Sequence, residues 1–168
     1  RGLGDVYKRQ LTDNPLHIIQ EVVDNATDEV LAGFGSRISV TLHADGGITV
    51  EDNGRGIPTG LHPEEKVPVV ELVFTRLHAG GKFAKSDGSG PYSCAGGLHG
   101  VGASVVNALS EWLTVQVHKN GNIYEMKFSR GKITQEMTII GSTDHTGTTV
   151  TFKPDPETVS YTHLTLPT

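Results

Sequence analysis

The sequence predicts an α+β fold, a two-layer sandwich with helices on one face of a mixed, mostly antiparallel sheet. Two kinds of periodicity indicate it: three segments carry apolar residues at helical spacing, and six shorter segments alternate with the two-residue period of strands. Short turns that contain glycine join several of the alternating segments, and such turns connect antiparallel neighbours. Helices gathered beside antiparallel strands favour one helical layer packed on one sheet.

Composition and charge narrow the class of protein. The chain of 168 residues is long enough for one domain with a core, and its net charge of −5 argues against a basic nucleic-acid-binding surface on this segment. A single cysteine, Cys94, excludes an internal disulfide framework and a cysteine-based zinc site. No apolar run approaches the roughly 20 residues of a membrane span. No signal peptide is recognisable either, so we expect a cytoplasmic protein.

The two ends differ from the rest of the sequence. Residues 1–10 and 158–168 carry no periodicity that continues the neighbouring elements, and they resemble translated sequencing adaptor. We interpret both as non-native tails and residues 11–157 as one domain that is truncated at both ends. The alternative is that they are ordinary disordered termini.

The first predicted helix begins after residues 12–14, which offer a side-chain cap, with Pro15 in its first turn. Gly33 is a suitable residue to end it. The apolar stripe that we expect to face the core consists of Leu16, Ile19, Val23, Ala26 and Val30.

A polar stripe on the same helix is the first candidate for function. It consists of His17, Glu21, Asn25 and Asp28, which recur at helical spacing along one side. A solvated surface is the ordinary explanation of such a stripe. This one lacks lysine and combines a histidine and an asparagine with carboxylates, which is unusual for a purely solvated face.

Two strands are predicted next, over residues 37–43 and 48–52, with a hairpin turn at residues 45–47. In the second strand, the two-residue period places Asp52 on the apolar face, so a carboxylate ends an apolar row. The alternative is an aspartate that merely forms the turn before the glycine-containing loop at residues 53–58. The half-buried face of the first strand is expected to consist of Ile38, Val40 and Leu42.

A short helix is predicted over residues 67–77, and a long glycine-rich segment follows it up to residue 96. Irregular segments of this length inside a domain are usually functional. We interpret this one as a lid, with Lys82 as a candidate phosphate contact. The alternative is a solvated lysine on a surface loop. The apolar positions of the helix are Val69, Leu72, Val73 and Leu77.

Residues 96–102 form a loop with four glycines in seven residues, and a helix is predicted directly after it, up to Leu109. Glycines let backbone N–H groups approach a ligand closely, and the start of a helix adds a positive dipole end, so this arrangement suits a phosphate. The loop matches neither a Walker loop nor a dinucleotide fingerprint. A simple turn is the alternative.

Four strands complete the predicted sheet. Two of the connections are turns at Asn120-Gly121 and Arg130-Gly131. Thr148 opens the last strand, where a threonine is ordinarily only a strand former. The four strands are expected at residues 113–119, 123–129, 132–139 and 148–153.

Five motifs stand in a fixed order along the chain, at residues 20–29, 51–58, 77–83, 96–102 and 147–148. Together they resemble the ATPase domain of the B subunit of bacterial type IIA topoisomerases, which has the GHKL (Bergerat) ATPase fold. The third and fourth motifs are specific to these subunits. Heat-shock chaperones, mismatch-repair ATPases and histidine kinases share only the looser pattern. Residues 12–21 and 73–77 are more similar to the B subunit of topoisomerase IV than to that of gyrase.

The resemblance implies an ATP site that uses Mg²⁺. Glu21 would be the general base that activates water for attack on the γ-phosphate, and His17, one turn earlier, would hold and tune it. Asn25 would coordinate Mg²⁺ through its amide oxygen. Asp52 would accept a hydrogen bond from the adenine amino group, with Thr148 in support.

The resemblance also assigns the residues around the nucleotide. Gly54 and Gly56 would give the adenine room, and Arg55 would pair with Glu29 at the mouth of the pocket. Lys82 and the backbone of residues 98–102 would cradle the phosphates. The remaining cofactor-binding positions are Asp28, Ile57, Pro58, Gly97, Leu98, His99, Gly100, Val101 and Gly102; Ile57 and Pro58 would form the apolar wall against the adenine.

The same resemblance implies how the whole subunit works. It would drive ATP-dependent DNA strand passage, with DNA and the A-type cleavage subunit as partners of parts that this sequence lacks. The full-length subunit would form homodimers through an N-terminal arm, and a following transducer domain would supply a phosphate-sensing lysine. Because both are missing here, we expect this fragment to be monomeric, to bind ATP and to hydrolyse it weakly.

Three alternatives stay open at this point. The chain could belong to the B subunit of gyrase, which supercoils DNA. It could be another GHKL ATPase or kinase, although no phosphoacceptor histidine domain or chaperone-type extension is visible. It could also be a non-catalytic nucleotide-binding module, which the presence of Glu21 disfavours.

Overall fold

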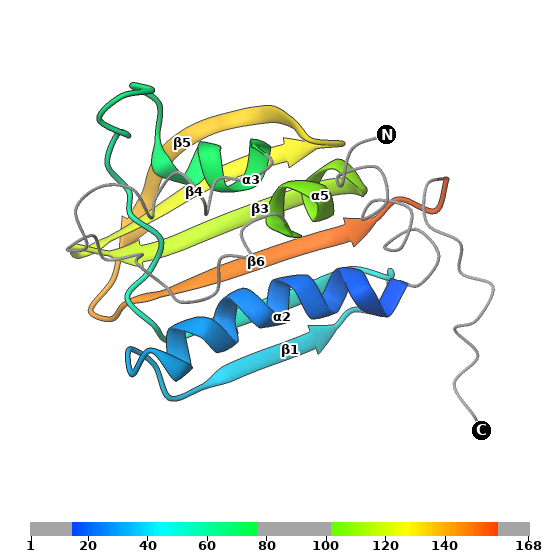
Figure 1. The fold of residues 1–168 in the computed structure, drawn as a ribbon, viewed down its shortest axis with the longest axis horizontal. Coiled ribbons are helices and arrows are strands. Elements are labelled where there is room, and N and C mark those ends of the chain that lie inside the picture. Colours follow the sequence, from blue (N-terminus) through cyan, green and yellow to red (C-terminus); the bar gives the residue numbers. More distant parts are fainter. Residues whose placement is uncertain (1–14, 77–101, 158–168) are drawn as a thin grey trace.

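The computed structural model describes residues 15–76 and 102–157, and in this part of the chain six strands form one sheet with the helices on one face (Figure 1). Every pair of neighbouring strands among these residues is antiparallel. The predicted two-layer α+β sandwich is therefore confirmed. In spatial order the strands are β1 (Ile38–Leu42), β2 (Ile48–Asp52), β6 (Gly147–Pro154), β3 (Ser110–Lys119), β4 (Asn122–Ser129) and β5 (Lys132–Ser142).

Helix α2 (Pro15–Leu31) ends at the glycine that the sequence indicates. Gly33 has a φ of +86°, its N–H donates to the carbonyl of Val30, and the N–H of Phe34 donates to the carbonyl of Glu29. These two bonds form a Schellman motif, which needs a left-handed residue at the position of Gly33. The predicted cap at residues 12–14 lies outside the described residues.

The apolar stripe of α2 is rotated from its predicted position. Leu16 is 56% exposed, whereas Ile18, Val22 and Ala26 are buried, and Ile19, Val23 and Val30 are only partly buried. Two carboxylates, Glu21 and Glu29, are buried with the apolar residues, each 8% exposed. Apolar periodicity alone could not reveal this, because the buried side of α2 includes acidic residues.

The prediction for the face of β1 is confirmed for Ile38, which packs against the core, and was wrong for Val40 and Leu42. Val40 and Leu42 are 46% and 70% exposed, although their partners Val50 and Ile48 on β2 are buried. β1 is one of the two edge strands of the sheet, so it has a neighbour on one side only (Figure 1). The alternation of residues in β1 predicts which face points toward the helices. It does not predict how far the helical layer extends over this strand.

The predicted hairpin turns are confirmed. Asn120 and Gly121 have φ angles of +53° and +80°, and Arg130 and Gly131 have +49° and +83°. Two consecutive residues with positive φ are typical of type I′ turns, whose twist matches that of antiparallel strands. At the first hairpin, the N–H of His43 donates to the carbonyl of Gly47.

Helix α3 (Val69–Thr75) is shorter than predicted, and helix α5 (Gly102–Ala108) has the predicted length but begins and ends one residue earlier. α3 buries Val70, Leu72 and Phe74, and residue Leu77 of the predicted stripe lies outside the described residues. Both helices pack with α2 over the sheet, and the core lies between the two layers. Its largest fully buried side chains include Phe128, Phe152, Ile18, Leu109, Leu113 and Met126.

Candidate functional site

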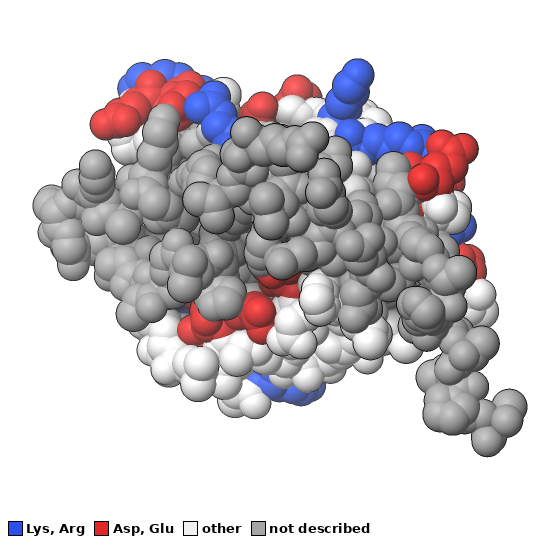
Figure 2. Space-filling model, turned by 45° about the vertical axis from the view of Figure 1, so that its right-hand side comes forward, with Lys and Arg blue, Asp and Glu red and all other residues white. Residues whose placement is uncertain are grey.

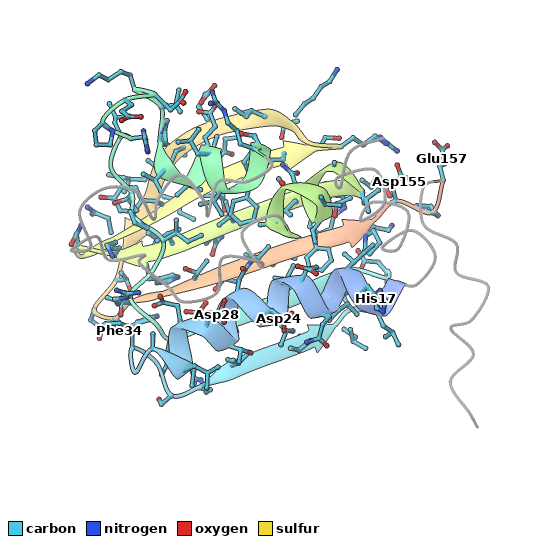
Figure 3. The ribbon with its side chains drawn as sticks, in the orientation of Figure 1. His17, Asp24, Asp28, Phe34, Asp155 and Glu157 are labelled. Carbon is cyan, nitrogen blue, oxygen red and sulfur yellow. The ribbon has the colours of Figure 1, made fainter. Side chains whose placement is uncertain are left out.

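Helix α2 supplies an acidic wall beside the sheet. Its 17 residues include four carboxylates and no lysine or arginine, and Asp24 and Asp28 follow one another along it (Figure 3). In Figure 2, one group of acidic side chains lies near the middle of the face shown, and other acidic side chains lie with basic ones near its edges. A polyphosphate could rest against such a wall only together with a cation that offsets the repulsion.

The residues of the predicted polar stripe differ in exposure. Glu21 is buried, Asn25 and Asp28 are partly buried, and His17 is exposed near the N-terminal end of α2 (Figure 3). The Glu21 carboxylate is therefore shielded from bulk water. The role of His17 as its tuning partner stays a prediction.

Glu21 meets the start of α5. A Cβ atom added to Gly102 would collide with the carboxylate and the Cβ of Glu21, so only a glycine fits at this position. The buried carboxylate of Glu21 is thus in contact with the backbone of Gly102, although 80 residues separate the two in the sequence. The glycine of α5 and the acidic stripe of α2, which were predicted separately, are brought together here.

Asp52 ends β2 on the helix-covered side, as predicted. Its Oδ1 accepts a hydrogen bond of 2.8 Å from the N–H of Gly54, and Thr148 of β6 lies directly opposite it in the register. Burial raises the pKa of Asp52 above its ordinary value, and the charge of Glu29 adds to this, while the Gly54 hydrogen bond opposes it. Asp52 is therefore a partly buried acceptor whose ionisation is unfavourable, and another donor would stabilise its charged form.

The loop after β2 is fixed by hydrogen bonds from distant elements. The N–H of Ile57 donates to Thr148 Oγ1 at 3.2 Å, and Thr146 Oγ1 donates to the carbonyl of Gly54 at 2.6 Å. Lys119 Nζ donates to the carbonyls of Arg55 and Gly56, at 3.0 and 3.2 Å. The loop at residues 53–58 is therefore held in one shape by β3 and β6.

Glycine is required at both predicted positions of this loop. Gly56 has a φ of +78°, and a Cβ there would come within 3.0 Å of the carbonyl of His118 and of Val117 Cγ1. A Cβ on Gly54 would come within 2.7 Å of Glu29 Oε2 and 3.0 Å of Asp52 Oδ1. A Cβ at either position would therefore meet protein atoms, and the room that these glycines would give the adenine stays a prediction.

Arg55 and Glu29 pair as predicted. Arg55 Nη2 donates to Glu29 Oε1 at 2.7 Å, while the Arg55 Nε and backbone N–H both donate to Oε2. The guanidinium also lies over the ring of Phe34, 3.6 Å from its centroid. Burial alone would raise the pKa of Glu29, but the hydrogen bonds and charge of Arg55 outweigh it and leave the pKa lowered.

The end of α2 explains this geometry. Glu29 and Phe34 are the residues that the Schellman motif joins, so one backbone turn presents both the carboxylate and the ring to Arg55. Phe34 was not singled out from the sequence. Its position one residue after the helix-ending glycine could have indicated it.

Lys119 and Thr146 were also missed as loop-fixing residues. Burial lowers the pKa of the Lys119 ammonium, and the nearby charge of Arg55 adds to this. Neither residue carries a local signal, because the carbonyls that they bind are distant in the sequence. Six predicted positions lie outside the described residues and remain predictions: Lys82, Gly97, Leu98, His99, Gly100 and Val101.

Within residues 15–76 and 102–157, no three histidine, cysteine or acidic side chains cluster as a self-sufficient metal site. The oxygen donors of α2 instead suit a hard cation that arrives with a phosphate ligand, since Mg²⁺ needs few protein ligands when phosphates supply the rest. No helix in these residues is both long and apolar enough to cross a membrane.

Comparison with known proteins gives consistent matches. The family model of "Histidine kinase-, DNA gyrase B-, and HSP90-like ATPase" matches residues 11–158. The chain is 58% identical over 162 residues to the DNA gyrase B subunit of Thermotoga maritima, covering 96% of this chain and 24% of that protein. It is 56% identical over 156 residues to the DNA topoisomerase 4 B subunit of Staphylococcus epidermidis, covering 92% and 22%.

A solved structure agrees with the sequence matches. The topoisomerase IV ATP-binding domain of Francisella tularensis, in complex with a small-molecule inhibitor, superposes with a TM-score of 0.74 at 41% identity. The match covers 89% of this chain and 39% of that one. The chain spans less than a quarter of the length of the Thermotoga and Staphylococcus relatives.

Proposed function

Because this chain belongs to the family of histidine kinase-, DNA gyrase B- and HSP90-like ATPases, we propose that it binds ATP with Mg²⁺ and hydrolyses it as part of a type IIA topoisomerase B subunit. The observation that carries the proposal is the arrangement along α2. Glu21 lies against Gly102 at one place, and two turns further on Glu29 and Asp52 flank Gly54. Helix α2 thus carries a buried potential base and, two turns further on, lies near a partly buried acceptor for the adenine amino group.

The adenine side follows from the chemistry of Asp52. Burial makes ionisation of the Asp52 carboxyl group unfavourable, and the N–H of Gly54 is one donor to it. The amino group of adenine would supply a second donor when the ring binds. Thr148 lies opposite and can support the ring directly or through water. Ile57 and Pro58, both partly buried, supply an apolar edge for a flat ring.

The phosphate side follows from Glu21 and the acidic wall. A buried carboxylate positioned near the terminal phosphate can accept a proton from attacking water. Asn25, with its amide oxygen, would hold Mg²⁺, which supplies charge neutralisation at the phosphates. Lys82 and the backbone of residues 97–102 would complete the phosphate contacts, and Asp28 would lie nearby on the same wall. His17 would orient Glu21.

The remaining properties belong to the whole subunit. We propose that it acts in the cytoplasm on DNA together with an A-type cleavage subunit and dimerises when complete. Relatives from both gyrase and topoisomerase IV match at nearly equal identity. The motif at residues 12–21 favours topoisomerase IV.

The test uses the purified chain and the variant Glu21→Ala. Titration calorimetry with Mg²⁺ and ATP should show binding in both proteins, because Glu21 is assigned to the chemical step. Hydrolysis, measured for this chain and for a longer chain that restores the following domain, should be lost only in the variant. Unchanged turnover would remove Glu21 from the mechanism, and absence of ATP binding to the parent chain would overturn the proposed function.

A further inference from the structure

Asn107 is a fully buried amide in a short helix whose residues 102–107 are all buried. Its exposed fraction is 0%, and its neighbours on α5 include Val105 and Val106. Asparagine is a weak helix former, and burial of an amide is costly unless it is hydrogen-bonded. A polar residue at such a place therefore needs a specific reason.

The reason lies at the end of α3. Asn107 Nδ2 donates a hydrogen bond of 2.8 Å to the carbonyl oxygen of Phe74. This carbonyl belongs to the last turn of α3, where carbonyl groups have no partner within the helix. Asn107 thus caps α3 from a different helix. Its Oδ1 is buried and has no hydrogen-bond partner in the described part of the chain.

The other end of α5 lies on the candidate site. Gly102, five residues before Asn107, packs on the carboxylate of Glu21 so closely that a Cβ could not be accommodated. α5 is therefore held between α3 at one end and α2 at the other. A rigid helix of this length transmits a shift of one end to the other, about 7 to 8 Å away.

We propose that Asn107 is a positioning residue, which holds α5 so that Gly102 supports the Glu21 carboxylate on the phosphate side of the nucleotide site. The inference rests on the proposed function, because it assigns Glu21 to the γ-phosphate. Asp52 and the loop at residues 53–58 are held instead by β3, by β6 with the residue before it, and by Glu29 near the C-terminal end of α2, and none of these contacts involves α5. Because the backbone of Gly102 is itself assigned to the phosphates, a shift of α5 on loss of the Asn107 hydrogen bond weakens contacts to the phosphates and leaves adenine binding unchanged.

The experiment compares affinities for Mg²⁺–ATP and for adenosine in the full 168-residue chain. Asn107→Leu keeps the approximate volume and removes the donor. We expect its ratio of ATP affinity to adenosine affinity to fall about tenfold, which corresponds to one net hydrogen bond. A merely structural role would lower the thermal midpoint and reduce both affinities together, or neither.

Ser110→Ala is the matched control. Ser110 is also fully buried, and its hydroxyl donates one hydrogen bond to a backbone carbonyl, that of Val106 within the same segment. It does not connect α5 to α3. We expect it to lower the thermal midpoint and to leave the affinity ratio at the parent value. A ratio that falls equally in both variants would overturn the inference.

Asn107→Asp decides the matter if the leucine variant does not fold. An ionised aspartate cannot donate to the Phe74 carbonyl, whereas a protonated one can. We expect its affinity ratio, relative to the parent at the same pH, to recover as the pH is lowered. A ratio that stays at the parent value at every pH contradicts the inference. Failure of the parent chain to bind ATP contradicts the proposed function instead.

Discussion

The loop at residues 53–58 and the junction between α5 and α2 lie on the same side of the sheet, but they are held by different kinds of contact. The loop donates hydrogen bonds to Glu29 and Thr148 and accepts them from Lys119 and Thr146, and these partners come from three separate parts of the chain. The junction depends on close packing of Gly102 on Glu21. The loop is thus fixed by several hydrogen-bond partners, whereas the junction can form only because Gly102 has no side chain.

This difference matches the tasks that we propose for the two regions. An adenine edge is recognised by a few hydrogen bonds at fixed positions, which requires a loop that does not move. On the phosphate side, a carboxylate and backbone N–H groups must lie within reach of the phosphoryl group that is transferred. Small displacements of these groups lower the reaction rate strongly. The loop should therefore tolerate loss of one partner, whereas the junction should not tolerate one added atom.

Gly102→Ala is expected to have the largest effect. The new methyl group collides with Glu21, so either α5 or the carboxylate must move, and ATP hydrolysis should fall about 100-fold or more. Steady-state hydrolysis and adenosine binding together check this, with adenosine affinity retained. Gly60→Ala is the control, because a Cβ there meets no atom within 4 Å. Parent-like hydrolysis in Gly102→Ala would show that the junction is tolerant.

Asp52→Asn should have an intermediate effect on binding. It replaces the carboxylate that accepts the adenine amino group, which should cost about 1–3 kcal/mol of ATP affinity. Adenosine affinity should fall by the same factor, since the phosphates do not contact this residue. Calorimetry with both ligands checks this, and Glu51→Gln on the opposite face of β2 is the control. Equal ATP affinity in Asp52→Asn would reject the adenine role.

The same variant should be more stable than the parent. The pKa of Asp52 is raised in the folded chain, so ionisation of this group costs stability as the pH rises from its ordinary pKa through the raised one. Asparagine cannot ionise. The gain in thermal midpoint should therefore be present at neutral pH and vanish in acid, below the ordinary aspartate pKa. A gain that is independent of pH would point to another cause.

Lys119→Met should have the smallest effect. It removes two hydrogen bonds to the carbonyls of Arg55 and Gly56. The loop keeps its hydrogen bonds to Glu29 and Thr148 and the one that it accepts from Thr146. ATP and adenosine affinities should both fall by less than about tenfold. Lys127→Met, an exposed lysine on β4, is the control in the same titrations. A much larger loss would mean that the loop depends on one partner.

Local patterns predicted much of the fold. The helix-ending Gly33, the two type I′ turns and the two strands at residues 38–42 and 48–52 are properties of short segments, and each is confirmed. The pairing of Arg55 with Glu29 came from the family resemblance and is also confirmed. Topoisomerase IV rather than gyrase, the domain boundaries and the role of Lys82 stay predictions.

What the sequence by itself determined is the alternation of its elements, their turns and the strand end that carries Asp52, because periodicity and turn chemistry act over a few residues. Only the tertiary structure decided that Leu42 is exposed, that Gly102 rests on Glu21 and that Asn107 caps α3. The cause is that exposure and such contacts depend on which elements become neighbours. Which elements become neighbours depends on how the whole sheet packs with its helices, and no single segment of the sequence contains that information.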